Sequence, residues 1–341
     1  MDFENTSSYK NGLFGLPTTL EQAQLVLLPV PWEVTASYGS GSALGPEAIL
    51  KESPQLDLYD YDFKDFIKKG VYWDKEFLSR SKISEDNKKF KERAYTIQKY
   101  LESSNQLSAE LKNSQQEINE LSAHINQTVY MAALNHLSNN KTVGLVGGDH
   151  SSPLGLMRAV LETHPDTGIL HIDAHADLRV SYQGFKYSHA SIMTNLLDLK
   201  PDLATLTQVG VRDFCQSEFN TIQSRDNIHC FFDAENKANM ALGANWDEIC
   251  SSILETLPQK VYISFDIDGL SPELCPNTGT PVPGGLSFHE ISYLFKRLKQ
   301  ANRQVVGFDL CEVAPADNSS WDGNVGARIL FKLCSVSLYQ Q

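Results

Sequence analysis

Short apolar runs that alternate with helix-length segments constrain the fold of this chain more than any other feature. Runs rich in Val, Ile and Leu predict strands at 24–30, 143–147, 168–173, 207–211, 228–232, 261–266 and 304–311. Apolar and polar residues hardly alternate within them, which is typical of strands buried on both faces of a sheet. Helices are predicted at 153–163, 188–199, 216–224, 246–257, 287–300 and 324–334. This order favours a three-layer α/β/α fold with a mainly parallel sheet.

Residues 79–140 differ from the rest, because they are polar and rich in Lys, Glu, Gln, Asn and Ser. Apolar residues recur there at three- and four-residue steps or their sums, which predicts amphipathic helices; they include Ala94, Ile97, Leu101, Leu111, Ile118, Leu121 and Ile125. We expect a single catalytic domain over 1–341 with a polar helical insertion at about 79–140. The insertion would cover the domain or form a subunit contact.

The charge balance narrows the range of partners. The 341 residues include 29 Lys and Arg against 42 Asp and Glu, a formal net charge of −13. This acidity argues against nucleic acid and against an anionic membrane surface as partners. The first residues lack the pattern of a signal peptide, and no apolar run reaches the ~20 residues of a membrane span. Six scattered cysteines without a C-x-x-C motif predict free thiols. We therefore expect a soluble, cytoplasmic protein.

Three short stretches place acids and histidines directly after predicted strands: GGDH at 147–150, DAHAD at 173–177 and DID at 266–268. Each stretch alone is compatible with an ordinary turn. Together they put carboxylates at the carboxyl ends of parallel strands, where sites form in open α/β sheets. Carboxylates packed this closely repel one another unless a cation lies between them. If residues 173–177 are extended, their acids and histidine point to one side.

The candidate metal ligands are His150, Asp173, His175, Asp177, Asp266 and Asp268. They are too many for one tetrahedral zinc ion, and their oxygen-rich character favours two divalent cations such as manganese. Two neighbouring residues are interpreted differently. Asp149 is predicted to brace the GGDH turn through backbone amides, and His171, inside an apolar run, is predicted to be a packed core residue.

These motifs resemble the ureohydrolase family of arginase, agmatinase, guanidinobutyrase and formiminoglutamase. The resemblance covers about 23–51 and 142–333 and includes DIDGLSPELCPNTGTPVPGGL at 266–286. It implies an arginase-like fold, two Mn²⁺ per chain (with Ni²⁺ or another divalent ion possible) and a homo-oligomer, trimeric or hexameric. The implied reaction is hydrolysis of a guanidino C–N bond with release of urea.

The resemblance also implies the role of each site residue. One manganese would be held by His150, Asp173, Asp177 and Asp266, and the other by His175, Asp173, Asp266 and Asp268. Asp177 would also orient the hydroxide that attacks the guanidinium carbon. His189, in YSHAS, would transfer protons to the leaving amine, and Glu312, in GFDLCEVAP, would pair with the guanidinium.

The stretch from Asp177 to Ser191 is similar to that of archaeal-type agmatinases and lacks the small polar residues with which arginases hold the amino-acid end of arginine. The resemblance therefore implies agmatine as substrate, a small cation hydrolysed to putrescine and urea in polyamine biosynthesis. The loop at 31–38 departs from the family pattern at Trp32, Val34 and Thr35. Arginine, guanidinobutyrate, guanidine and formiminoglutamate thus stay open as alternatives.

Two other classes of protein are compatible with the same fold. A zinc deacetylase would share it but would lack the equivalents of His150 and Asp177, both present here. A non-catalytic relative would have lost metal ligands, whereas this chain has the full set. The sequence therefore favours a binuclear hydrolase.

Overall fold

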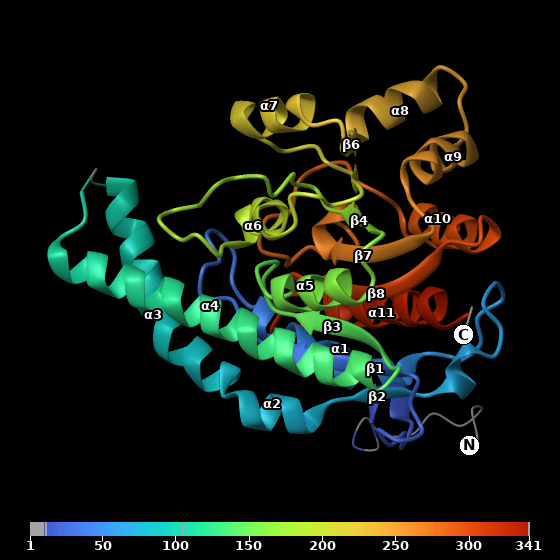
Figure 1. The fold of residues 1–341 in the computed structure, drawn as a ribbon, viewed down its shortest axis with the longest axis horizontal. Helices are drawn as coiled ribbons and strands as arrows, with labels where there is room; N and C mark the ends of the chain where they lie inside the picture. The colour runs from blue at the N-terminus through green and yellow to red at the C-terminus, as the bar shows by residue number, and fades with distance from the viewer. Residues whose placement is uncertain (1–9, 11, 104–105, 340–341) are drawn as a thin grey trace.

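The centre of the molecule is one sheet of eight strands in the order β2-β1-β3-β8-β7-β4-β5-β6 (Figure 1). A computed structural model describes residues 10, 12–103 and 106–339. All pairs of neighbouring strands are parallel. The strands are β1 (Leu25–Val30), β2 (Val71–Trp73), β3 (Thr142–Gly147), β4 (Thr167–Ile172), β5 (Leu206–Val209), β6 (Ile228–Phe231), β7 (Lys260–Asp266) and β8 (Gln304–Cys311).

The predicted parallel α/β fold is therefore confirmed, and each predicted strand is present to within two residues at either end. The short edge strand β2 was missed, because three residues are too few to show a pattern. The helices are α1 (Gly45–Glu52), α2 (Lys75–Ser81), α3 (Ile83–Ser103), α4 (Ala109–Ser138), α5 (Leu154–Thr163), α6 (Ile192–Leu199), α7 (Gln216–Ser224), α8 (Asp233–Ala241), α9 (Trp246–Thr256), α10 (Phe288–Gln300) and α11 (Trp321–Leu338).

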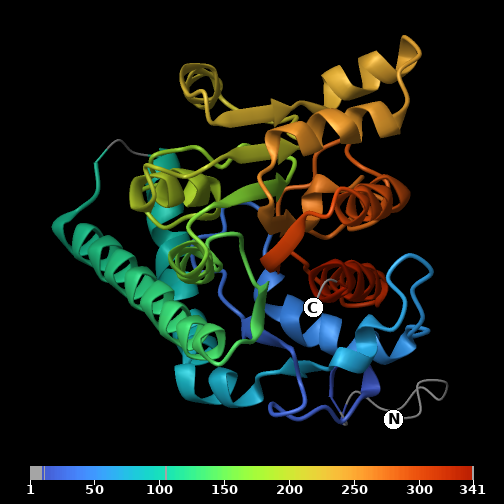
Figure 2. The ribbon, with the colours of Figure 1, turned by 45° about the vertical axis from the view of Figure 1, so that its right-hand side comes forward.

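Helices cover both faces of the sheet (Figure 2). The two faces have separate apolar cores: α1, α9, α10 and α11 contribute to one, and α3, α4, α5 and α6 to the other. Successive residues of β1 point alternately into the two cores. Leu25 and Leu27 belong to the first core, Val26 and Leu28 to the second, and all four are fully buried. This two-sided burial explains why the strand sequences are continuously apolar.

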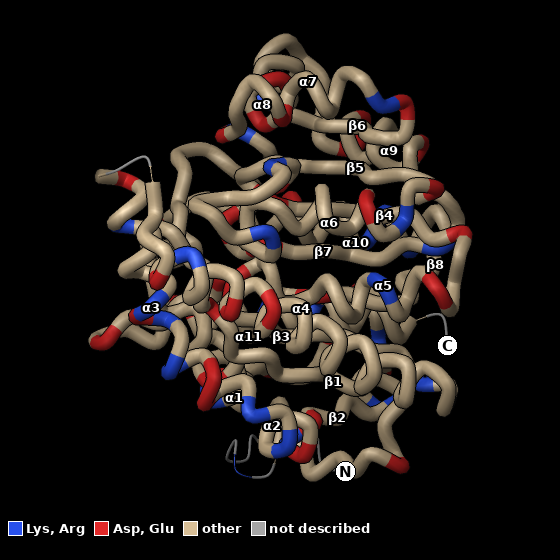
Figure 3. Tube along the Cα trace, turned by 60° about the vertical axis from the view of Figure 1, so that its left-hand side comes forward, with Lys and Arg blue, Asp and Glu red and all other residues tan. Residues whose placement is uncertain are grey.

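The amphipathic helices predicted for 79–140 are confirmed as α3 and α4, and the short helix α2 precedes them. Helix α4 packs against α5, and buried Ala94, Ile97, Ile118 and Ile125 form part of the core on that face. Charged residues of both signs lie along the outside of α3 (Figure 3). In the part of the chain that the structure describes, none of the helices has the length and apolar character needed to cross a membrane. The six cysteines are free, as predicted.

The strand order brings together the segments that carry the sequence motifs. Strands β3, β8, β7 and β4 are consecutive in the sheet, and each is followed by one predicted site segment. Those segments are 147–150 after β3, Glu312 after β8, 266–268 at the end of β7 and 173–177 after β4. The loop after β1 lies on one side of this group, and the loop after β5 lies on the other.

Candidate metal centre

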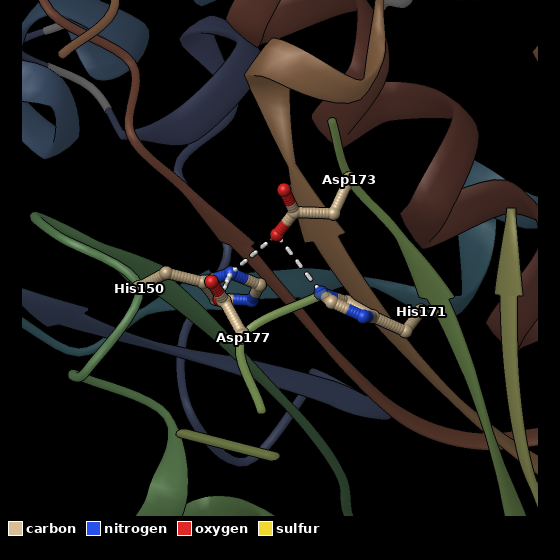
Figure 4. A group of neighbouring side chains, drawn as sticks. All are labelled: His150, His171, Asp173 and Asp177. Carbon is tan, nitrogen blue, oxygen red and sulfur yellow. Dashed lines mark hydrogen bonds and ion pairs between the residues drawn. The ribbon is translucent and has the colours of Figure 1, made fainter. Parts of the chain in front are cut away.

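Three carboxylates surround one ring nitrogen of His150. Its Nδ1 lies 3.0 Å from Asp173 Oδ2, 3.1 Å from Asp177 Oδ2 and 3.4 Å from Asp266 Oδ2. The four side chains come from three different strand ends, and each is at most 5% exposed. Figure 4 shows Asp173 and Asp177 both pointing toward the His150 ring.

A second group adjoins the first. His175 Nδ1 lies 3.4 Å from Asp173 Oδ1 and 3.1 Å from Asp268 Oδ2. Asp173 thus presents one oxygen to each group. Asp266 Oδ1 accepts a hydrogen bond from the Asp268 backbone N–H at 2.9 Å, which fixes the turn after β7. The structure therefore brings all six candidate ligands together.

The pKa shifts in this cluster show that its buried carboxylates repel one another. Burial, followed by the charges of Asp268 and Asp173, raises the pKa of Asp266 well above its ordinary value. Burial and the nearby Asp173 raise the pKa of Asp177 to about 6. Burial alone would lower the pKa of His175, but Asp268 and Asp173 outweigh it and raise that pKa to about 12. Burial and mutual repulsion thus disfavour the charged form of these acids, and cations among them would relieve the repulsion.

The donor set fits two divalent cations. Four carboxylates and two imidazoles form two adjoining groups that share Asp173, and the His171 ring also lies against the first group. A single tetrahedral ion would leave buried carboxylates without a counter-charge. Oxygen-rich sets of this kind suit ions such as Mn²⁺, and imidazoles are also compatible with Ni²⁺.

A chain of polar contacts fixes the other ring nitrogen of His150, the one that points away from the carboxylates of the cluster. Its Nε2 lies 2.8 Å from Ser264 Oγ, which lies 3.2 Å from Asp309 Oδ1. The other Asp309 oxygen accepts a hydrogen bond from Tyr262 at 2.8 Å. Such contacts fix the tautomer of a metal-ligating histidine and aim its free nitrogen at the metal. Ser264 and Asp309 were not predicted as site residues, although a polar residue inside an apolar strand was a usable signal.

His171 corrects one interpretation made from the sequence. It is fully buried in β4, as predicted, but it is more than a packed core residue. Its Nε2 lies 2.9 Å from Asp173 Oδ2 (Figure 4), and its Nδ1 lies 2.9 Å from Gln208 Nε2 on β5. His171 therefore holds the shared carboxylate from the side opposite His150.

Two site residues have left-handed backbone conformations, which are unfavourable for residues other than glycine. The φ angles are 53° at Asp177 and 63° at Glu312. The chain therefore does not stay extended as far as Asp177, although the side chains of 173–177 still converge. Glu312 Oε1 accepts a hydrogen bond from the His150 backbone N–H at 2.9 Å. Asp149 braces its turn as predicted, accepting the Ser151 N–H at 3.0 Å.

A cavity of about 410 Å³ opens above the second group, with His175, Asp177 and His189 in its lining. His189 Nε2 lies 3.2 Å from Ser37 Oγ, on the loop after β1. Burial, followed by the nearby His175, lowers the pKa of His189 to about 4. On the β5 side the cavity is lined by Asp213, whose carboxylate has no ion-pair or hydrogen-bond partner among the described residues. The cavity thus has a neutral base at one wall and a free acid at the other.

Comparison with known proteins places this arrangement in a family. A family model described as the arginase family matches residues 23–335. The chain belongs to the arginase family. Among its relatives, an N(1)-aminopropylagmatine ureohydrolase from Synechocystis sp. is 32% identical over 317 residues, which cover 93% of this chain and 90% of the relative. An agmatinase from Halalkalibacterium halodurans is 24% identical over 305 residues, 88% of this chain and 87% of the relative.

Solved structures agree on the fold. The crystal structure of the agmatine ureohydrolase of Thermoplasma volcanium has a TM-score of 0.69 and 24% identity, and the match covers 94% of this chain and 91% of that one. The arginase-like fold expected from the sequence is therefore confirmed. As an arginase-family member, the protein is a metal-dependent hydrolase of the ureohydrolase type, and its buried Asp and His cluster fits a metal site.

Proposed function

We propose that this protein hydrolyses the guanidino group of an agmatine-type amine and releases urea. The observation that carries the proposal is the pair of adjoining ligand groups that share Asp173, beneath a cavity with a free carboxylate on its wall. A guanidinium with an amine tail is cationic at both ends, which matches acidic groups at the floor and at the wall.

The proposed ligands are the same six residues identified in the sequence. One ion would be held by His150, Asp173, Asp177 and Asp266, and the other by His175, Asp173, Asp266 and Asp268. We propose manganese, with nickel as the nearest alternative. When bound, such a pair of cations lowers the pKa of a water molecule toward neutrality and makes it a nucleophile at neutral pH.

Three side chains would complete the reaction. Asp177 lines the cavity floor and would accept a hydrogen bond from the attacking water. Glu312 would pair with the guanidinium, since its Oε1 is already held by the His150 backbone and its other oxygen faces Gly279. His189 is neutral at physiological pH and would accept a proton at a ring nitrogen and pass it to the leaving amine.

Of the agmatine-type compounds, N(1)-aminopropylagmatine is the first candidate and agmatine the second. The relative from Synechocystis sp. carries the first activity in its name and shares 32% identity with this chain. The motif at 177–191 resembles agmatinases, which supports agmatine. Both compounds would extend an amine along the cavity toward Asp213.

The test is urea release by the manganese-loaded protein. N(1)-aminopropylagmatine and agmatine are compared with arginine, guanidinobutyrate, guanidinopropionate and guanidine, and ammonia release from formiminoglutamate is followed in parallel. We expect the highest kcat/KM for one of the two agmatine-type compounds and no turnover by Asp266→Asn. A higher kcat/KM for arginine or formiminoglutamate would show that the proposed agmatine-type substrate is wrong. One tightly bound zinc with amide-deacetylating activity would reject the reaction itself.

A further inference from the structure

Three polar side chains of α3 contact the loop after β1; two of them are buried, and the third, Lys91, is 35% exposed. They are Asn87, Lys91 and Gln98. Lys91 is four residues after Asn87 and Gln98 is eleven residues after it, so all three lie on one face of a helix with 3.6 residues per turn. Asn87 is 6% exposed and Gln98 is 3% exposed. Burying polar groups to this extent is unfavourable unless they are hydrogen-bonded, so their partners are informative.

All three hold the loop that follows β1. Asn87 Oδ1 accepts the Glu33 backbone N–H at 2.7 Å, and Lys91 forms an ion pair with the buried Glu33 carboxylate. The other Glu33 oxygen accepts the Gly41 N–H at 2.6 Å, which ties the two ends of the loop together. Gln98 Nε2 donates to the backbone carbonyls of residue 35 at 3.3 Å and residue 36 at 3.1 Å.

The next residue of this loop is Ser37, which touches the proposed proton-transfer histidine. Ser37 Oγ lies 3.2 Å from His189 Nε2, and both residues line the cavity. The carbonyl held at 3.1 Å by Gln98 belongs to Ala36, immediately before Ser37. The path from Gln98 to His189 therefore runs through a single peptide unit and one side-chain contact.

Helix α4 holds the loop that carries His189 itself. Asn119 Oδ1 accepts the Lys186 backbone N–H at 2.9 Å. A Cβ at Gly184 would lie 2.0 Å from Gln115 Nε2, so this loop passes directly against α4. The two helices are tied to each other by a hydrogen bond from Arg93 to Ser114 at 2.9 Å. One helical hairpin thus contacts both loops that meet at His189.

We infer that the α3–α4 hairpin aligns Ser37 with His189, and that Gln98 is a positioning residue that acts on His189 through Ser37. The inference rests on the proposed function, in which His189 transfers the proton. Misplacing a reacting group by about 1 Å can cost ~10²-fold in rate. A polar helical segment outside the metal centre would thereby control the proton-transfer step.

The test replaces Gln98 by Met, which keeps the length of the side chain and removes both donors. We expect a roughly tenfold lower kcat, with KM and bound manganese close to wild type. Hydrogen exchange of backbone amides in 31–41 should become faster. Ser122→Ala is the matched control, because Ser122 is also buried in the hairpin but, among the described residues, its hydroxyl bonds only the Ile118 carbonyl within α4. If Gln98→Met does not fold, Gln98→Glu removes the same donors at equal size.

The double variant separates positioning from general stabilisation. In a His189→Ala background, Gln98→Met should cause no further loss of kcat, because the group that it positions is gone. An equal loss in both backgrounds, or unchanged exchange in 31–41, would overturn the inference. Absence of urea release by the wild type would instead reject the proposed function, while the exchange measurement still reports whether Gln98 holds the loop.

Discussion

The contact between His150 Nε2 and Ser264 Oγ shows how much of the metal centre depends on residues that do not face it. Nδ1 is turned toward the carboxylates, so in the tautomer that ligates a metal through Nδ1 the proton is on Nε2, which then donates to Ser264, and Ser264 in turn donates to Asp309. Removing the serine hydroxyl leaves a buried N–H without a partner and frees the ring to rotate.

We therefore predict that Ser264→Ala binds Mn²⁺ about 10- to 100-fold more weakly than wild type, as measured by calorimetric titration. Thr207→Val is the matched control, because this buried hydroxyl in β5 bonds Thr256 instead of the metal cluster. Equal affinity in Ser264→Ala and the control would contradict a role for Ser264 in aiming His150.

His189 is predicted to be neutral throughout the physiological range. Burial lowers its pKa from 6.5 to about 4, so between these values the unfolded chain binds more protons than the folded one. The contribution of this group to stability is therefore present above pH 6.5 and is lost as the pH falls toward 4. An NMR titration of ¹⁵N-labelled histidine should show no protonation of His189 between pH 6 and 9; a midpoint near 6.5 would refute this.

Replacing His189 by alanine separates proton transfer from metal binding. The side chain lines the cavity and lies outside both ligand groups, so both metals should remain bound. Loss of a general acid–base group should lower kcat by about 10²- to 10⁴-fold. Urea-release kinetics and metal analysis of the same preparation check both statements. Wild-type turnover in this variant would remove His189 from the mechanism.

Asp213 is predicted to select for the amine tail of the substrate. Its carboxylate is exposed on the cavity wall, so Asp213→Asn should raise KM for an agmatine-type substrate only about two- to fivefold. Guanidinobutyrate, whose tail is anionic, should show no such increase. A matched increase for both substrates would contradict an electrostatic role for Asp213.

At the scale of elements, the turn after β3 depends on a close approach that permits only glycine. A Cβ at Gly148 would lie 2.0 Å from the backbone oxygen of Trp32, which cannot rotate away as a side-chain end could. We predict that Gly148→Ala lowers the free energy of unfolding by about 1–3 kcal/mol and weakens metal binding through the displaced His150. Urea denaturation and metal analysis test this; unchanged values for both would show that the two loops can separate freely.

The positions at which the strands end could be predicted from the sequence more fully than the tertiary contacts between helices, strands and loops. Runs such as 261–266 are mostly apolar and end at an acid, so strand and ligand positions followed together. Helices α1 and α8 were not predicted, since each is short and lies within a loop-like stretch. The contact between Gln98 and the carbonyl of Thr35 joins residues 63 positions apart. Local periodicity contains no information about such a contact, which is why the hairpin was expected only to cover the domain or join subunits.

At the scale of the whole molecule, the metal ions should stabilise the fold. Four carboxylates of the cluster are buried within one region of a chain with a net charge of −13. Ligands that bind only the folded state stabilise it by about 2.7 kcal/mol at 100 times their Kd. Removing manganese from the manganese-loaded protein with a chelator should therefore lower Tm by roughly 4 °C for each ion released. In the Asp266→Asn variant, the same treatment should change Tm far less, because a proposed metal ligand has been removed. An equal change in Tm in the variant and the wild type would contradict this prediction.

The order of strands in the sheet has a consequence for synthesis on the ribosome. Strands β7 and β8 lie between β3 and β4, yet they are made about a hundred residues later. A nascent chain that ends before residue 260 has already exposed the histidines and acids of the GGDH and DAHAD motifs. The edges of β3 and β4 that later pair with β8 and β7 are then still open. The full set of candidate ligands is therefore present only after residue 268 has been made, and until then these edges are open to pairing with other chains.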